Sequence, residues 1–249
     1  MRPLITLLTD FGTADGYVGE MKGVLLSALP DATVVDVSHE IPPQDVELAR
    51  LTVARYWRRF PAGTIHLAVV DPGVGSSRAA LAVATEGRLL VGPDNGVLSP
   101  ALLMPGVRVV ALAVPAGAAP TFHGRDVFAP AAAALARGAA LESLGTPWPD
   151  PVVRRTPEPV REGNGALRGE VIAIDRFGNL VTNLAGVRGG VVRIAGQVLP
   201  VRRTYGDAPP AALVALVGSS GLLEIAMRDG SAADALGLTR GATLHVAPE

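Results

Sequence analysis

Three polar segments of the sequence combine residue types that can do chemistry. Asp10 follows an apolar run near the start of the chain, and Asp71 begins the segment DPGVGSSR, which ends with Arg78. His123 lies in FHGRD, just ahead of an alanine-rich stretch. An arginine favours the hydroxide form of a bound water, and an aspartate–histidine pair can orient that water and accept its proton. Taken singly, each of these residues is more often a turn residue, a helix cap or a surface charge.

Other familiar chemical motifs are absent from the sequence. The chain has no cysteine, which excludes disulfides, thiolate zinc sites and cysteine nucleophiles. No second histidine stands at ligand spacing around HGRD, so we expect no metal. GVGSSR lacks the lysine of a phosphate-binding loop, and GSSG lacks the strand–helix context of a hydrolase serine. Of the other histidines, His66 is expected to be packed within a strand, while His39 and His245 have no sequence neighbours that suggest a role.

The composition is that of a folded globular protein. Hydrophobic residues make up 49% and charged residues 18% of the 249 residues, so the chain is neither disordered nor a polyelectrolyte. The net charge of −1 gives no general attraction to nucleic acid or to an anionic membrane surface. The N-terminal apolar run PLITLLT is too short for a membrane span or a signal peptide. We therefore expect a cytoplasmic protein with no nucleic-acid or membrane partner.

The first part of the chain, residues 1–145, alternates strand-like and helix-like patterns. Strands are expected at 4–9, 33–38 and 64–70, as a pair in LAVAT and RLLVG, and in VRVVALAV; helices are expected over 17–29, after an N-cap at Asp45, and over 126–137. This alternation predicts an N-terminal α/β domain with a mostly parallel sheet and flanking helices. Ligands bind beyond the carboxyl ends of the strands in such sheets, so Asp10 and Asp71 are expected at the same edge.

The pattern changes after Gly145. The segment TPWPDPVVRRTPEP is rich in proline and cannot continue a helix or a central strand, which predicts a proline-rich linker over 146–166. Residues 167–249 hold short β-like runs separated by glycine-bearing turns: GEVIAID, LVTNL, VVRIAG, ALVALVG and LLEIAM. Only SAADALG suggests a helix. This part is predicted to be a smaller C-terminal β domain, either a β-barrel or a sandwich.

Six motifs occur in a characteristic order along the chain: TDFGTADGYVGEMKG, DPGVGSSR, GPDNGVL, TFHGRDVFAP, DRFGNLVTNL and GSSGLLEIAMRDGSAA. Together they resemble the S-adenosyl-L-methionine (SAM) hydrolase family, also called SAM hydroxide adenosyltransferases, which is related to the fluorinases and chlorinases. The resemblance runs from about residue 4 to about residue 245. It implies an α/β domain joined to a C-terminal β-barrel-like domain, and a homotrimer with its sites at subunit interfaces. It also implies hydrolysis of SAM to adenosine and L-methionine by water, with no metal and no cofactor.

The resemblance further implies roles for individual residues. Asp71, Arg78 and His123 match the triad that the hydrolase branch uses. Asp10 matches the acid that binds the ribose hydroxyls, and Asp175 matches the acid near the methionine ammonium group. The other matching positions contact the adenine base or the rest of the ligand: Phe177 by stacking, Asn179 by a hydrogen bond, Tyr205 as a second aromatic, and Ser219, Glu224 and the backbone near Met227.

Two other functions stay open beside hydrolysis. A halogenase delivers chloride or fluoride, which arrives already as an anion, whereas water must be polarised or deprotonated before it attacks C5′. The intact set of Asp71, Arg78 and His123 therefore favours the hydrolase over the halogenase. A non-catalytic adenosine or SAM sensor that keeps the binding pocket is the third reading. The residues do not indicate which member of the triad acts as the base.

Overall fold

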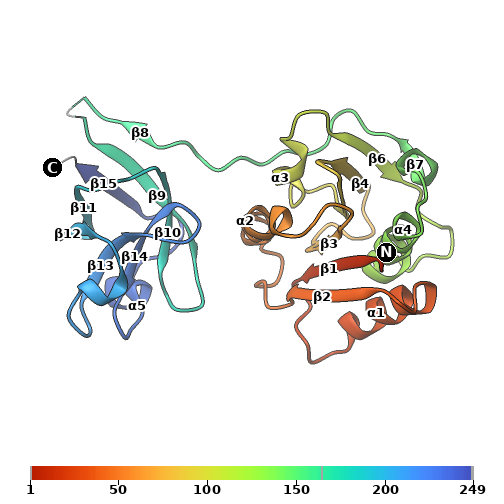
Figure 1. Cartoon of the computed structure of the whole chain (residues 1–249), viewed down its shortest axis with the longest axis horizontal. Coiled ribbons are helices and arrows are strands. Elements are labelled where there is room, and N and C mark those ends of the chain that lie inside the picture. The colour runs from red at the N-terminus through yellow and green to blue at the C-terminus, as the bar shows by residue number, and fades with distance from the viewer. Residues whose placement is uncertain (1, 164, 248–249) are drawn as a thin grey trace. The chain divides into compact units, whose positions relative to one another are not determined.

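The chain forms two compact units, Met1–Arg155 and Thr156–Glu249, each with its own sheet and core (Figure 1). This structure is a computed structural model, and it describes residues 2–163 and 165–247. The predicted combination of an α/β unit with a C-terminal β-barrel is confirmed. None of the helices within the described residues is long and apolar enough to cross a membrane.

The N-terminal unit is built on one seven-stranded sheet with the order β2-β1-β3-β5-β4-β6-β7. Its strands are β1 (Leu4–Thr9), β2 (Thr33–Ser38), β3 (Ile65–Val69), β4 (Ala80–Thr85), β5 (Arg88–Pro93), β6 (Arg108–Leu112) and β7 (Gly145–Pro147). β1 pairs in parallel with β2 and β3, and β3 pairs in parallel with β5. β4 is antiparallel to both β5 and β6, and β7 is antiparallel to β6, so only β4 and β7 oppose the common direction. The sheet is mostly parallel, as predicted.

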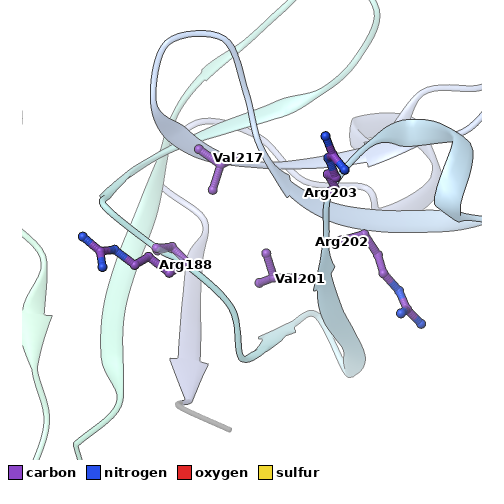
Figure 2. Close-up of a pocket in the computed structure, with 6 residues that line it drawn as sticks. Arg188, Val201, Arg202, Arg203 and Val217 are labelled. Atoms are coloured by element: carbon purple, nitrogen blue, oxygen red, sulfur yellow. The ribbon is translucent and has the colours of Figure 1, made fainter.

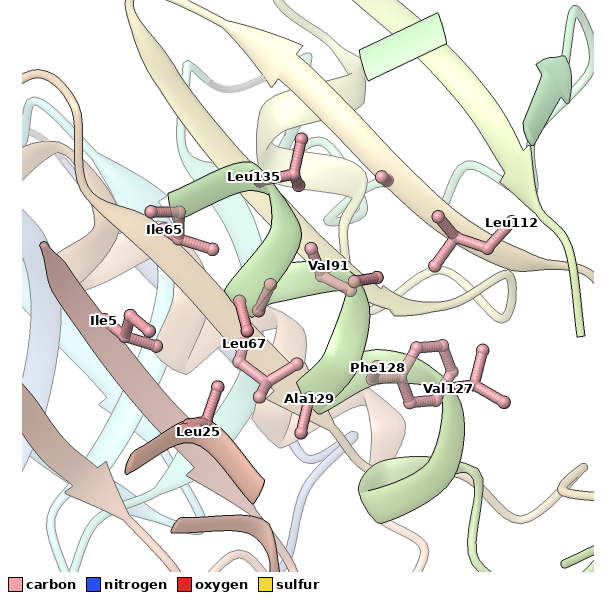
Figure 3. Packing of buried hydrophobic residues seen from close by; sticks show 14 of the residues in the cluster. Ile5, Leu25, Ile65, Leu67, Val91, Leu112, Val127, Phe128, Ala129 and Leu135 are labelled. Carbon is pink, nitrogen blue, oxygen red and sulfur yellow. The ribbon is translucent and has the colours of Figure 1, made fainter. Parts of the chain in front are cut away.

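Helices cover both faces of this sheet. Helices α1 (Tyr17–Ala28) and α4 (Ala129–Ala136) pack on one face, and α2 (Val46–Tyr56) and α3 (Ser99–Leu102) pack on the other. Successive strand residues point to opposite faces, so Leu7 belongs to the first core and Leu8 to the second. Figure 3 shows the first core, where Leu25 of α1 and Ala129 of α4 pack over sheet residues. Asp45 caps α2 as predicted, because its side chain accepts a hydrogen bond from the Leu48 backbone N–H at 2.9 Å.

The helix after His123 differs from the prediction of one continuous helix over 126–137. It begins with a π-helical turn at Gly124–Phe128, in which the N–H of Ala129 bonds to the carbonyl of Gly124, and only then continues as α4. A π-turn widens the helix by one residue per turn and is common beside functional sites. Here it directly follows one of the three candidate catalytic side chains.

The C-terminal unit is a closed barrel. Its strands are β8 (Val160–Arg161), β9 (Leu167–Ile174), β10 (Leu180–Ala185), β11 (Val191–Ile194), β12 (Gln197–Arg202), β13 (Leu213–Val217), β14 (Leu222–Met227) and β15 (Thr243–Ala247), with the short helix α5 (Ala232–Leu236). The order runs β10-β14-β13-β12-β11-β15-β9, and the pairing of β9 with β10 closes this ring of seven strands. Within the described residues, β8 pairs with β9 alone and stays outside the ring.

Two barrel strands, β12 and β15, were not among the runs identified from the sequence. β12 contains Pro200, and a proline lacks the N–H of a strand ladder, so the run is a weak strand by pattern alone. β15 is a five-residue strand with only two buried side chains, Leu244 and Val246. β12 and β15 pair with β11, one on each side of it, and this pairing holds both strands in the barrel.

The proline-rich segment lies against the N-terminal unit as far as Arg154. The indole N–H of Trp148 donates to Asp94 Oδ2 at 2.9 Å, and the Val152 N–H donates to Asp94 Oδ1 at 2.7 Å. The Arg154 N–H donates to the Ser99 hydroxyl at 2.8 Å. Asp94 is buried, and a buried carboxylate requires hydrogen-bond donors. The N–H groups of Trp148 and Val152 supply them.

Candidate active site

Asp71, Arg78 and His123 form one hydrogen-bonded array in the N-terminal unit. Arg78 donates from Nε to Asp71 Oδ1 at 2.9 Å and from Nη2 to Asp71 Oδ2. The same Nη2 lies 3.0 Å from Nδ1 of His123. The side chains of Arg78 and Asp71 are 10% and 5% exposed, so this is a largely buried, two-point ion pair. The structure thus brings together three residues that the sequence places on two separate loops.

The contact with Arg78 determines the protonation of His123. A guanidinium can only donate hydrogen bonds, so Nδ1 of His123 must be the acceptor. Burial, and after it the charge of Arg78, lower the pKa of His123 below its ordinary value. The imidazole is therefore neutral near pH 7 and carries its proton on Nε2. In this state Nε2 can act only as a donor, and neither ring nitrogen is free to accept a proton.

The guanidinium of Arg78 retains one unused donor. Its Nη1 is buried and has no hydrogen-bond partner within the described residues. The guanidinium carbon lies 5.3 Å from the ring centre of Phe128, which belongs to the π-helical turn. A cation held over an aromatic face with an unpaired N–H can stabilise a negative oxygen beside it.

Close backbone packing joins the loop of Asp71 to the loop of His123. Gly75 has a left-handed φ of 76°, and a Cβ at this position would collide with the carbonyl oxygen of Pro120. Only glycine meets both conditions without strain. On the other side, the amide of Asn95 donates to the carbonyl of Val70 at 2.8 Å and holds the end of β3 next to Asp71. Neither contact was foreseen from the sequence, although GPDNGVL, which contains Asn95, is one of its motifs.

Asp10 follows β1 at the same edge of the sheet as Asp71, which follows β3. Its Oδ2 accepts a hydrogen bond at 2.8 Å from the N–H of Gln44. The neighbouring residue Thr9 bonds to His39 through its hydroxyl, 2.8 Å from Nδ1. His39, for which no role was expected from its sequence neighbours, is buried, and Thr9 lies 30 positions away from it in the sequence.

The two remaining histidines, His66 and His245, differ in burial. His66 is fully buried in β3, as expected, with its Nδ1 2.8 Å from the Thr6 hydroxyl. Burial, and then the charge of Arg88, lower the pKa of His66 to about 4. His245 is partly exposed, and its Nδ1 lies 3.2 Å from Glu162.

In the C-terminal unit, Asp175 and Asn179 shape one tight turn between β9 and β10. Asp175 Oδ1 accepts from the N–H groups of Phe177 and Asn179, at 2.9 and 3.0 Å, and its Oδ2 accepts from the Asn179 amide at 2.9 Å. Asn179 is buried, whereas Phe177 at the tip of the turn is 75% exposed. An exposed phenylalanine on a rigid turn provides a free aromatic face, as a stacking residue requires.

Tyr205 and Glu224 meet on the same unit. The Tyr205 hydroxyl donates to Glu224 Oε2 at 3.3 Å, and burial together with the charge of Glu224 raises the pKa of Tyr205. Glu224 is buried and lies against Gly218, where a Cβ would overlap its carboxylate. Ser219 is exposed in the turn 218–221, which connects β13 to β14, and Met227 is the last residue of β14.

A pocket of about 440 Å³ on the barrel is lined by Val187, Arg188, Val201, Arg202, Arg203 and Val217 (Figure 2). In the close-up the side chains of Arg188 and Arg202 extend away from each other. None of the residues implied by the resemblance lines this pocket. Among the described residues there is no group of three or more histidine, aspartate or glutamate side chains that could hold a metal ion.

Two family models match the chain. The SAM hydroxide adenosyltransferase N-terminal domain matches residues 5–145, and the SAM hydroxide adenosyltransferase C-terminal domain matches residues 169–245. The chain belongs to the SAM hydroxide adenosyltransferase family. The triad lies within the first match and the turn of Asp175 within the second, so both groups of candidate residues belong to the family's own domains.

Individual relatives agree with this membership in the SAM hydroxide adenosyltransferase family. The chain is 47% identical to an (R)-S-adenosyl-L-methionine hydrolase of Thermus thermophilus, over 97% of this chain and 98% of that protein. It is 31% identical to a fluorinase of Actinopolyspora mzabensis, over 98% and 97% of the two chains. Among solved structures, an uncharacterized conserved protein from Thermotoga maritima superposes with a TM-score of 0.89 at 33% identity, covering 98% of this chain and 100% of that one.

Proposed function

We propose that this protein hydrolyses SAM to adenosine and L-methionine. The observation that carries the proposal is the array of Asp71, Arg78 and His123, with its neutral imidazole and its unpaired guanidinium N–H. A water bound at this array meets a fixed positive charge and a carboxylate. Both act on a nucleophile that is neutral before the reaction, and a halide would need neither of them.

The reaction consists of one displacement. The water oxygen forms a bond to C5′ while the bond from C5′ to sulfur breaks, and the electron pair of that bond stays on the sulfur of methionine. The sulfonium leaves as a neutral thioether, so no general acid is required. The water proton passes to Asp71, because Nδ1 of His123 is occupied by Arg78 and Nε2 already carries a proton. The array aligns one water behind C5′, and this alignment contributes to the rate.

The same proposal assigns the remaining residues to substrate binding. Asp10 binds the ribose hydroxyls, and Asp175 lies near the methionine ammonium group. The adenine base stacks on Phe177 and Tyr205 and is bonded by Asn179, while Ser219, Glu224 and the backbone near Met227 make the other contacts. The 75% exposure of Phe177 supports a site that is completed by association of subunits, and we propose a homotrimer in which each site lies at a subunit interface.

The experiment that tests this function is incubation of the purified protein with SAM in water enriched in ¹⁸O. Chromatography and mass spectrometry should detect adenosine and methionine, with the heavy oxygen in adenosine, because the water attacks carbon. Addition of a chelator should leave the rate unchanged, since no step uses a metal. A halogenated nucleoside formed when chloride or fluoride is added would establish the halogenase instead. Tight binding of SAM without any product would establish the sensor.

The configuration at sulfur provides a second comparison. The relative from Thermus thermophilus is named for the R form of SAM, and we propose that this protein also acts on that epimer. Separate incubations with the two sulfonium epimers should show faster release of adenosine from the R form. Equal rates, or a preference for the S form, would contradict this part of the proposal.

A further inference from the structure

We propose that His39 is a positioning residue that fixes the carboxylate of Asp10 for the substrate. This inference rests on the proposed function, because Asp10 is taken to bind the ribose there. His39 follows β2, and Asp10 follows the neighbouring strand β1 (Figure 1). His39 is 5% exposed and contacts the segment Thr9–Gly12 at both ends, on either side of Asp10.

The side chain of His39 lies between Asp36 and the loop of Asp10. Its Nε2 lies 3.1 Å from Asp36 Oδ1, and Lys22 donates to Asp36 Oδ2 at 2.6 Å. Burial alone would raise the pKa of Asp36, but the interactions with Lys22 and His39 outweigh it and lower the pKa. Asp36 is therefore a carboxylate, and its negative charge lies beside the buried imidazole.

The Thr9 hydroxyl connects the imidazole to the loop of Asp10. The hydroxyl oxygen of Thr9 is hydrogen-bonded to Nδ1 of His39 at 2.8 Å. The same oxygen accepts a hydrogen bond from the N–H of Phe11 at 3.3 Å. Thr9 and Phe11 are the two neighbours of Asp10, so the hydroxyl of Thr9 links the imidazole to the residues on both sides of the acid.

The backbone of His39 holds the far end of the same segment. Its carbonyl accepts from the N–H of Gly12 at 2.8 Å. The residues after His39 then bend back to Asp10 itself, where the N–H of Gln44 donates to Oδ2 at 2.8 Å. Gln44 adopts a left-handed φ of 67°, which a residue with a side chain adopts only when its surroundings hold it there.

The arrangement leaves one oxygen of Asp10 for a ligand. Within the described residues only Oδ2 accepts a hydrogen bond from the protein, and Oδ1 is not used. Two adjacent ribose hydroxyls need acceptors at defined positions. The carboxylate of Asp10 is held by contacts to the residues on both sides of it and through one of its own oxygens. It is therefore already ordered before the substrate binds, and binding costs little conformational entropy at this side chain.

The test compares substitutions at His39 by steady-state kinetics on SAM. His39→Leu removes the imidazole and its hydrogen bond to Thr9, and we expect KM to rise about 10-fold while kcat stays within about 3-fold, since a lost bond of this kind weakens substrate binding and not the attack on C5′. His39→Asn can place an amide oxygen near the position of Nδ1, so it should recover most of the lost affinity. Thr9→Val removes only the hydroxyl and should raise KM in the same direction. The control is His245→Leu, a partly exposed histidine of the other unit, which should change neither constant.

A double variant separates positioning from general support of the fold. If His39 acts through Asp10, then His39→Leu added to Asp10→Ala should raise KM no further than Asp10→Ala alone. Effects that multiply fully, a loss confined to kcat, or a normal KM in both His39→Leu and Thr9→Val would overturn the inference. If His39→Leu does not fold, as judged by its melting temperature, Thr9→Val alone decides the question. If the wild type releases no adenosine, the proposed function fails, and calorimetric affinities for SAM and adenosine then test His39 by the same comparison.

Discussion

Arg78 donates two hydrogen bonds to Asp71, from Nε to Oδ1 at 2.9 Å and from Nη2 to Oδ2, and both side chains are largely buried in the loop they share. The planar guanidinium matches the two oxygens of the carboxylate. Its third nitrogen, Nη1, is left without a hydrogen-bond partner within the described residues. His123 then meets the shared Nη2. Three residues joined in this way should behave as one unit in catalysis.

The first prediction concerns alanine substitutions in this array. Asp71→Ala, Arg78→Ala or His123→Ala should each lower kcat by about 10²–10⁴-fold, the range typical of acid–base groups. Arg78→Ala combined with His123→Ala should cost little more than the worse single variant, because both serve the same water. The matched control is Arg108→Ala, an exposed arginine paired with Glu142, whose loss should leave kcat unchanged. Full turnover in the single variants would mean that the array only supports the fold.

The second prediction concerns Arg78→Lys, which keeps the charge but loses the fork. A lysine can reach one oxygen of Asp71 and cannot at the same time donate to His123. We expect kcat to fall by about 10²-fold or more, with a smaller change in KM. If Arg78→Lys were as active as the wild type, charge alone would be sufficient and the geometry described above would not matter for the rate.

The third prediction concerns the pH dependence of the rate. Burial and the charge of Arg78 lower the pKa of His123, so half of the imidazole is protonated only at a pH below its ordinary pKa of about 6.5. Protonation of Nδ1 would remove the acceptor for Arg78 and place a second positive charge beside it. The acid limb of the pH–rate profile should therefore be centred below the ordinary histidine value. An acid limb centred at or above the ordinary histidine value in the wild type would contradict this assignment.

The fourth prediction concerns Gly75→Ala. The left-handed φ of 76° and the approach of the Pro120 carbonyl both oppose a side chain here, so we expect a loss of about 1–3 kcal/mol in the free energy of unfolding. The loops of Asp71 and His123 should also separate, which lowers kcat. Gly63→Ala is the control: its φ is also left-handed, but no atom lies within 4 Å of the added Cβ, so only the stability should fall. Equal kcat in the two variants would argue against the contact between the loops.

The fifth prediction concerns stability in acid. The pKa of His66 is lowered to about 4 by burial and by Arg88, while in the unfolded chain it lies at about 6.5. Between these values the unfolded state binds a proton that the folded state does not, so stability is complete above pH 6.5 and falls as the pH is lowered toward 4, by up to about 3 kcal/mol. His66→Gln should flatten this dependence in denaturant titrations at several pH values, whereas His245→Gln should leave it intact. An unchanged slope in His66→Gln would assign the acid sensitivity to other groups.

Much of the fold could be predicted from the sequence because it depends on local patterns. The apolar runs of β1, β2 and β3 and the stripe of Val18, Met21 and Leu25 on α1 each reflect a periodicity that lies within one element. Parallel strands that alternate with helices place their carboxyl ends together, which brings the loops of Asp10 and Asp71 to one edge. The contact between Asp71 and Arg78 is also nearly local, since both lie on one short loop.

The tertiary structure alone decided the rest. His123 lies 45 positions from Arg78, and His39 lies 30 positions from Thr9, so their contacts depend on how separate loops pack and not on any local pattern. The tautomer of His123 follows from its contact with Arg78, which the sequence does not place beside it. The π-helical turn before α4 and the strands β12 and β15 likewise take their form from neighbours in space. Local preference determines which elements form, but long-range packing determines which side chains they bring within hydrogen-bonding distance.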